Sequence, residues 1–275
     1  MSNGNSGGDT ANYTCLRAPE PVRVDGRLNK PAWSAAPRSG RFVDIVTGDP
    51  AFFDTRMASL WDDRALYVAF WLDEPDVRAS FTERDSFIWF DHDAELFIGG
   101  DDCYYEFEIN AHGTVYEVFF VWQDALKAGS RFDTPEFDLR ARNVDVLGGF
   151  QDPSRYGKHP RGKRWAFMDW DFPGLETGVS VDGTLNDSSD VDKGWVVEMA
   201  LPWEGFKSLL PSRSFPPKEG DTLRMQFFRF EALRTLGKTI AESPGWSLNA
   251  HGVYDSHLPE KFATVHFTER TAGLP

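Results

Sequence analysis

The sequence predicts an all-β protein, an antiparallel β-sandwich, on the basis of three observations. About ten runs of alternating or continuous apolar residues recur at regular spacing, each bounded by Gly, Asp, Asn or Pro, which is typical of short strands. Only residues 203–210 show a short helical pattern. At 275 residues, the chain is long enough to bury the core of one large β-domain.

The N-terminal part is expected to contain a tail followed by short strands. Residues 1–12 are mostly Gly, Ser, Asn and Asp, so we expect a disordered tail before a single domain over residues 13–275. Candidate strands lie at residues 13–18 and 42–45, and an Asp-Gly turn at residues 25–26 separates them.

Two hairpins are predicted in the first half of the chain. Residues 55–61 and 65–73 are almost continuously apolar around an Asp-Asp-Arg turn, which indicates strands buried on both faces. Residues 94–98 and 105–109 alternate apolar with acidic or polar residues around a Gly-Gly-Asp-Asp turn, and we call them the acidic hairpin. Residues 115–121 extend the acidic hairpin into a three-stranded meander.

The second half begins with an irregular segment. Residues 125–174 are rich in Gly, Pro, Arg and Asp and are predicted to form an insertion, with a strand within residues 137–146. Residues 175–186 and 195–201 then form another hairpin, which Pro202 ends because proline has no N–H for the sheet. The last two strands are expected at residues 223–231 and 262–267.

Charge and cysteine content exclude several classes of protein. The net charge of −14 and a pI of about 4.8 disfavour nucleic acid and anionic membranes as partners. The first ten residues lack the apolar core of a signal peptide, and no apolar run is long enough for a membrane span. We therefore expect a soluble protein, cytoplasmic as written, or extracellular or periplasmic if an export signal was removed. Cys15 and Cys103 either form one disulfide or remain free thiols.

One face of the acidic hairpin carries groups that could hold a polar ligand. Glu95 lies on its first strand, and Glu106, Glu108 and Asn110 share one face of its second strand, with Trp89 just before the hairpin. A sugar presents C–H groups to an aromatic face and hydroxyls to carboxylates and amides. These residues are therefore candidate sugar ligands; the alternatives are a solvated strand face and, for Trp89, a place at the rim of the core.

Two more residues are candidates for the same site. Arg229 lies among three phenylalanines, and its guanidinium is suited either to ligand hydroxyls beside the acidic hairpin or to a buried salt bridge. Trp246 lies in a Pro- and Gly-flanked loop, where it either contacts ligand or packs under the sandwich. Both alternatives remain open for each residue.

A loop in the second half is rich in oxygen ligands for a metal. Its spacing is not that of an EF-hand, so it forms either a Ca²⁺ site or a hairpin turn capped by Asp and Ser. No two histidines are spaced for zinc, and no nucleophile elbow, P-loop or dinucleotide motif occurs. The candidate Ca²⁺ ligands are Asp182, Asn186, Asp187, Asp190 and Asp192.

Six segments in a fixed order together resemble a known family. They are VDGRL at 24–28 before PAW at 31–33, LWDD at 60–63 before LYV at 66–68, residues 89–97 ending in DAELF, YEFEIN at 105–110, GTLN at 183–186 with GWVVEMALPW at 194–203, and PEKF at 259–262. In this order they resemble carbohydrate-binding module family 9, in its elaborated, stand-alone branch. The resemblance spans about residues 13–267 and omits the insertion.

The resemblance implies an immunoglobulin-like or jelly-roll sandwich that grips a sugar between two aromatic rings, with structural calcium. It makes Trp89 one aromatic wall, because Trp89 lies eight residues before the phenylalanine of the DAELF motif. It also assigns hydroxyl contacts to Glu95, Glu108 and Asn110, although the family places an arginine where this chain has Glu108. This chain has Ser256 at the position of the second aromatic wall, and serine has no ring. An aromatic residue from the same loop is therefore expected to form that wall. The two candidates for it are Trp246 and Tyr254.

These observations predict lectin-like, non-catalytic binding of a mono-, oligo- or polysaccharide, for example at a chain end. A first alternative is a glycoside hydrolase or lyase, because neighbouring carboxylates raise one another's pKa and so form an acid/base pair. Its acid/base candidates are Glu95, Glu106 and Glu108. A second alternative is a structural or protein-interaction sandwich whose aromatic residues belong to the core or an interface.

Overall fold

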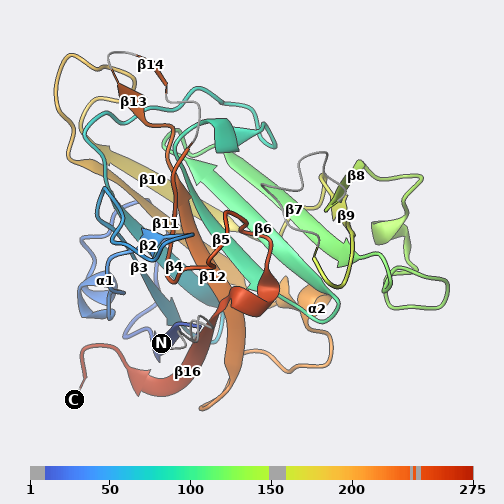
Figure 1. The fold of residues 1–275 in the computed structure, drawn as a ribbon. Coiled ribbons are helices and arrows are strands. Elements are labelled where there is room, and N and C mark those ends of the chain that lie inside the picture. Colours follow the sequence, from blue (N-terminus) through green and yellow to red (C-terminus); the bar gives the residue numbers. More distant parts are fainter. Residues whose placement is uncertain (1–9, 149–158, 236–237, 240–242, 275) are drawn as a thin grey trace, which may run out of the picture.

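The protein is nearly all β, as predicted, in a computed structural model that describes residues 10–148, 159–235, 238–239 and 243–274 (Figure 1). The predicted tail at residues 1–12 lies largely outside the described residues. The first strands are β1 (Asn12–Arg17), β2 (Val43–Asp44), β3 (Thr55–Trp61), β4 (Ala65–Asp73), β5 (Asp93–Gly99), β6 (Cys103–Asn110), β7 (Val115–Trp122) and β8 (Val144–Leu147). The later strands are β9 (Arg164–Phe167), β10 (Glu176–Asp182), β11 (Gly194–Pro202), β12 (Thr222–Phe230), β13 (Arg234–Thr235), β14 (Lys238–Thr239), β15 (Gly245–Ser247) and β16 (Ala263–Thr271).

In the described part of the chain, helical structure is confined to short segments. The two α-helices are α1 (Pro31–Ala35) and α2 (Phe206–Leu209), and α2 lies within the stretch predicted to be helical. Single turns of 3₁₀-helix occur at Ile88–Phe90, Pro135–Phe137 and Pro259–Lys261. Among the described residues, none of these helices has the length and apolar character to cross a membrane.

Most of the strands belong to one hydrogen-bonded sheet of 14 strands. Their order is β10-β11-β4-β3-β1-β16-β12-β5-β6-β7-β9-β8, with β15 beside β12 and β2 beside β15. Strands distant in this order face each other across the core, because Phe70 of β4 meets Phe227 of β12 edge-on at 6.0 Å between ring centroids. The sheet therefore folds over on itself as a sandwich (Figure 1).

The acidic hairpin lies in one layer of this sandwich as β5 and β6, and β7 completes the predicted meander. Its register pairs Glu95 with Glu108, and Phe97 with Glu106. Because side chains alternate across a strand, the acidic residues of β5 and β6 point away from the main core. The opposite face buries Leu96 and Phe107 in that core.

The insertion contains more sheet than expected. We predicted a strand within residues 137–146, whereas the structure has 3₁₀-helix at Pro135–Phe137 and begins β8 only at Val144. Strand β9 pairs with β7, and β8 pairs with β9, so the two strands extend the sheet beyond β7 (Figure 1). Both cysteines are buried free thiols, so the disulfide alternative is wrong.

Candidate functional site

The outer face of the acidic hairpin forms the floor of a cavity of about 580 Å³. Glu95, Glu106 and Glu108 lie on this floor, as the strand register requires. Neighbouring β7 contributes Tyr116 and Phe120 to the lining. The remaining walls come from the segments around residues 87–90, 145–147, 166–168, 230 and 243–257.

Aromatic side chains make up much of the cavity wall. Trp89 is half-buried, stacks on Phe87 with 4.5 Å between centroids, and meets Tyr116 edge-on at 5.2 Å. Tyr254 is also half-buried and packs edge-on against Phe230 at 5.8 Å. The aromatic lining residues are Phe87, Trp89, Phe90, Tyr116, Phe120, Phe230 and Tyr254.

The carboxyl groups on the floor are almost completely removed from bulk water. The exposed fraction is 3% for Glu95, 4% for Glu106 and 2% for Glu108, so the interpretation as a solvated strand face is wrong. Burial raises the pKa of Glu106 to about 8. Burial, together with the neighbouring carboxylates, also raises the pKa values of Glu95 and Glu108 well above their usual range.

The charge of the cavity lining is one-sided. Asp145 and Asp255 add two more carboxyl groups, whereas no lysine or arginine lines the cavity in the described part of the chain. His257 adds no positive charge, because burial and then the charge of Arg164 hold its pKa well below the usual range. A ligand here meets aromatic faces and carboxyl oxygens, a combination suited to a hydroxyl-rich ring.

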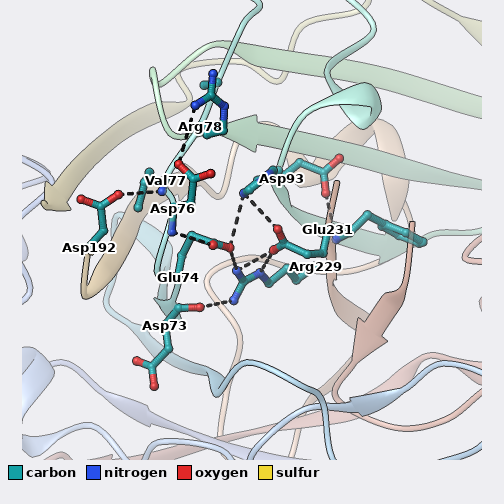
Figure 2. Close-up of polar contacts among 12 residues, drawn as sticks. Asp73, Glu74, Asp76, Val77, Arg78, Asp93, Asp192, Arg229 and Glu231 are labelled. Carbon is teal, nitrogen blue, oxygen red and sulfur yellow. Dashed lines mark hydrogen bonds and ion pairs between the residues drawn. The ribbon is translucent and has the colours of Figure 1, made fainter. Parts of the chain in front are cut away.

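Arg229 does not reach this cavity. Its guanidinium is completely buried on the core side of β12 and donates to Glu74, Glu231 and the carbonyl of Asp73 (Figure 2). It also donates to Thr55 Oγ1. The predicted ligand contact is therefore replaced by the alternative, a buried salt bridge. The physical reason is the strand period of two, which points Arg229 away from the face that holds Phe228 and Phe230.

Trp246 is also excluded from the cavity by the fold. Its indole is 2% exposed, meets Phe53 edge-on at 5.9 Å and lies under the Arg229 guanidinium at 5.2 Å. It is thus a core residue, the alternative we had left open. Of the two candidates for the second wall, only Tyr254 lines the cavity, beside Ser256.

Asn110 lies on β6 but has no capacity left for a ligand. Its amide nitrogen donates to the carbonyl of Phe81 and to Asp91 Oδ2, and its Oδ1 accepts from the N–H groups of His112 and Thr114. The side chain is fully buried. Its observed role is to hold the β6–β7 turn, not to contact a ligand.

The loop predicted to bind Ca²⁺ is held by hydrogen bonds within the protein. Asp192 accepts the N–H groups of Val77 and Thr184 (Figure 2). Asn186 pairs with both backbone groups of Ala79. Each remaining acidic side chain of the loop has its own partner: Asp182 has Lys193, Asp187 has Ser189 and Asp190 has Thr184. This pattern matches the capped-turn alternative, and in the described residues the groups of three potential ligands lie elsewhere.

Several residues of the site were missed by the sequence analysis. Asp93 precedes Glu95 by two positions, so the strand alternation could have revealed it as a member of the same face. Tyr116 and Phe120 follow the same rule on β7. Asp255 and His257 come from an irregular loop, where no local pattern predicts the direction of a side chain.

Comparisons with known proteins agree with this architecture. The sequence profile described as carbohydrate-binding family 9 matches residues 51–130, which include the acidic hairpin and β7. A comparison with curated proteins finds no match. Among solved structures, a candidate carbohydrate-binding protein from Bacteroides uniformis has a TM-score of 0.59 at 15% identity, covering 94% of this chain and 100% of that one.

Two further solved structures carry the family name itself. A carbohydrate-binding module of family 9 from Caldicellulosiruptor kristjanssonii, in complex with cellotriose, has a TM-score of 0.53 at 13% identity, covering 96% of this chain and 98% of that one. The same source with glucose gives a TM-score of 0.52 at 11% identity, covering 95% and 99%. These three likenesses show that the chain shares its β-sandwich fold with those proteins. In sequence, the chain resembles carbohydrate-binding family 9 over residues 51–130.

Proposed function

We propose that this domain binds a carbohydrate without catalysis, in the cavity between Trp89 and Tyr254. One observation carries the proposal: buried carboxyl groups and half-buried aromatic rings converge on a single cavity of about 580 Å³, a volume typical of small-ligand sites. The rings offer faces to the C–H groups of a sugar, and the carboxyl oxygens offer acceptors to its hydroxyls. The complexes of the Caldicellulosiruptor module with cellotriose and glucose support this ligand class.

Each predicted sugar contact that lines the cavity has a role in this proposal. Trp89 and Tyr254 provide the aromatic walls, while Glu95, Glu106 and Glu108 provide the polar floor. Phe87 and Phe90 line the same cavity and are 50% and 66% exposed. Their rings would therefore contact a longer saccharide chain. A mono-, oligo- or polysaccharide end is therefore the expected ligand.

The glycosidase alternative has less support from the electrostatics of the cavity. Glycoside hydrolysis needs one protonated carboxylic acid and one ionised carboxylate, held apart by different environments. In this cavity, burial is the main cause of a raised pKa for all three candidates, Glu95, Glu106 and Glu108. A hydrogen bond with Glu108 lowers the pKa of Glu106 relative to the other two, but its value of about 8 still lies above neutral pH, so burial favours the protonated form of all three.

The saccharide proposal predicts a specific loss of binding for Trp89→Ala. Titration calorimetry against glucose, cello-oligosaccharides and a panel of other neutral sugars should detect binding by the parent protein. We expect Trp89→Ala to bind at least about tenfold more weakly, because truncating a central aromatic anchor costs about 2 kcal/mol. Tyr254→Ala should weaken the same ligand.

Phe52→Ala is the matched control, because Phe52 is 73% exposed and does not line the cavity. Its affinity should equal that of the parent protein. The proposal is wrong if no sugar in the panel binds, or if Trp89→Ala and Phe52→Ala bind equally well. Release of reducing sugar from an oligosaccharide, lost in Glu106→Gln, would favour the glycosidase alternative instead.

A further inference from the structure

Three carboxylate oxygens in the floor of the cavity have no hydrogen-bond partner among the described residues. They are Oδ2 of Asp93, Oε2 of Glu95 and Oε2 of Glu108. The three side chains are 0%, 3% and 2% exposed, so water cannot satisfy these oxygens from bulk solvent. Unpaired buried carboxylates are costly, and native proteins therefore rarely leave them without a partner.

The strand register brings the three groups together. Glu95 and Glu108 are directly opposed across β5 and β6, and Asp93 precedes Glu95 by two positions on the same face. One oxygen from each carboxylate lies within 4.8 Å of the other two. Asp93 uses its other oxygen, Oδ1, to accept the N–H of Phe230 at 3.0 Å, which directs Oδ2 toward the cluster.

Among the described residues, no lysine or arginine balances the charge of this cluster. In the described part of the chain, no lysine or arginine forms an ion pair with Asp93, Glu95 or Glu108. The nearest histidine contact joins His257 Nε2 to Glu106 Oε1 at 3.7 Å, on the adjacent carboxyl group.

A second buried acidic group in the same domain differs in this respect. Glu74 and Glu231 lie beside His92, and one ligand atom from each of the three residues lies within 4.8 Å of the other two. Both carboxylates pair with Arg229 at 2.6 Å (Figure 2). Within the described ranges, an arginine therefore pairs with the carboxylates of one cluster, and no arginine or lysine pairs with those of the other.

We infer that Asp93, Glu95 and Glu108 bind one divalent cation, for which Ca²⁺ is the best match. Two ligands on opposite sides of a calcium ion lie up to about 4.8 Å apart, since each Ca–O distance is about 2.4 Å. Three carboxylates and no nitrogen or sulfur ligand favour a hard cation over zinc. Mg²⁺ keeps most of its waters and is seldom held by three carboxylates, so it fits less well.

The position of this ion relates it to the cavity. Glu95 and Glu108 line the cavity, whereas the fully buried Asp93 does not. The ion would therefore lie in the floor, with Asp93 behind it and its remaining coordination positions facing the cavity. Water or ligand hydroxyls would fill those positions, as Ca²⁺ takes six to eight oxygen ligands. The ion site itself rests on the three carboxylates alone and does not depend on the saccharide proposal.

Calcium titration of metal-stripped protein tests the inference. The protein is treated with EDTA, exchanged into chelator-free buffer, and titrated with CaCl₂ by calorimetry, while its melting temperature and metal content are measured. We expect one Ca²⁺ per chain and a higher melting temperature in its presence. Glu108→Gln and Asp93→Asn should each weaken Ca²⁺ binding about tenfold or more, because each removes one charged ligand.

These variants also keep the test decisive if one of them folds poorly. Asp93→Asn retains the oxygen that accepts the Phe230 N–H. Glu108→Gln keeps the length and shape of the side chain, so the melting temperatures of the metal-free variants show whether each of them folds. Asp190→Asn, in the loop of residues 182–192, is the matched control and should bind Ca²⁺ like the parent. Absence of Ca²⁺ binding to the parent, or unchanged binding by Glu108→Gln and Asp93→Asn, would overturn the inference.

Sugar titrations in EDTA and in CaCl₂ separate this inference from the proposed function. Sugar binding by a protein that binds no Ca²⁺ would remove the ion site and leave the saccharide proposal intact. Calcium binding without any sugar binding would do the reverse. MgCl₂ at the same ionic strength should raise the melting temperature of the parent less than CaCl₂ does. If both salts raise it equally and no heat of Ca²⁺ binding is measured, the stabilisation is a general salt effect, which contradicts the ion site.

Discussion

His251 illustrates how burial decides the charge of a single residue in this domain. The imidazole is 4% exposed, and its Nδ1 donates to the carbonyl of Asp255 at 2.8 Å. Its Nε2 lies 3.0 Å from the side-chain amide nitrogen of Gln226. A proton on Nε2 would face an amide donor with little water nearby. Burial is the main reason that the pKa of His251 is lowered to about 4.

This lowered pKa predicts a loss of stability in mild acid. The unfolded chain binds a proton at His251 near pH 6.5, whereas the folded protein binds it only near pH 4. The contribution of His251 to stability is therefore fully present above pH 6.5 and is lost as the pH falls toward 4. Relative to His251→Gln, the unfolding free energy of the parent should fall by about 2 kcal/mol between pH 7 and pH 4.5.

Chemical denaturation at a series of pH values measures this difference. His112→Gln, the same substitution at an exposed position, is the matched control. Parallel pH profiles for the parent and His251→Gln would show that His251 is not held neutral by the fold.

At the scale of strands, Arg229 joins β12 to the end of β4. Its guanidinium donates at 2.8 Å to the carbonyl of Asp73, the last residue of β4, and at 2.6 Å each to the carboxylates of Glu74 and Glu231 (Figure 2). All the charged side chains of this network are at most 3% exposed. A buried network of this kind is very sensitive to loss of one partner, because the remaining charges stay buried without compensation.

Arg229→Met should therefore destabilise the fold without weakening sugar binding. We expect the unfolding free energy to fall by about 3 to 5 kcal/mol, as for other broken buried ion pairs. The folded fraction should retain the parent's sugar affinity, because Arg229 does not line the cavity. Urea denaturation and sugar titration measure the two effects separately.

Lys193→Met is the matched control for this prediction. Lys193 pairs with Asp182 at 3.1 Å, and both side chains are largely exposed, at 79% and 70%. An exposed pair contributes at most about 1 kcal/mol. A similarly small effect of Arg229→Met on the unfolding free energy would contradict the prediction that the buried network stabilises the fold.

At the scale of the whole molecule, the sandwich core encloses both cysteines. Cys15 and Cys103 are 0% and 2% exposed and belong to the main hydrophobic cluster. Burial is the main reason that the pKa of each thiol is raised to about 12. Neither thiol therefore forms the reactive thiolate while the domain is folded.

Thiol labelling should then report on global unfolding. At pH 8, we expect the native protein to react with DTNB at neither cysteine within minutes, and the guanidinium-unfolded protein to react at both. The melting temperature should be the same with and without dithiothreitol, because the thiols are free. Ser189→Cys, at an exposed position, is the positive control and should react at once; equally fast labelling of the parent would show that the core opens locally.

The acidic hairpin was predictable from the sequence because its pattern is local. Alternation of apolar and acidic residues specifies both the strands and the side on which Glu95, Glu106 and Glu108 lie, since the pleat has a period of two. The same rule placed the meander of β5, β6 and β7 and the hairpin of β10 and β11. Pairing of strands that are neighbours in the sequence needs no information from distant parts of the chain.

The composition of the cavity was decided by contacts between distant segments. Residues near 145 and 166 reach the cavity on β8 and β9, which pair beyond β7, and residue 254 comes from a loop more than 140 positions after the acidic hairpin. Arg229 and Trp246 are candidates for the cavity by residue type, but both face the core, where Arg229 pairs with Glu74 and Trp246 packs against Phe53. The sequence gives the chemical type of each side chain and, within a strand, the face on which it lies. The residues that it contacts depend on packing between distant segments, which a local pattern does not specify.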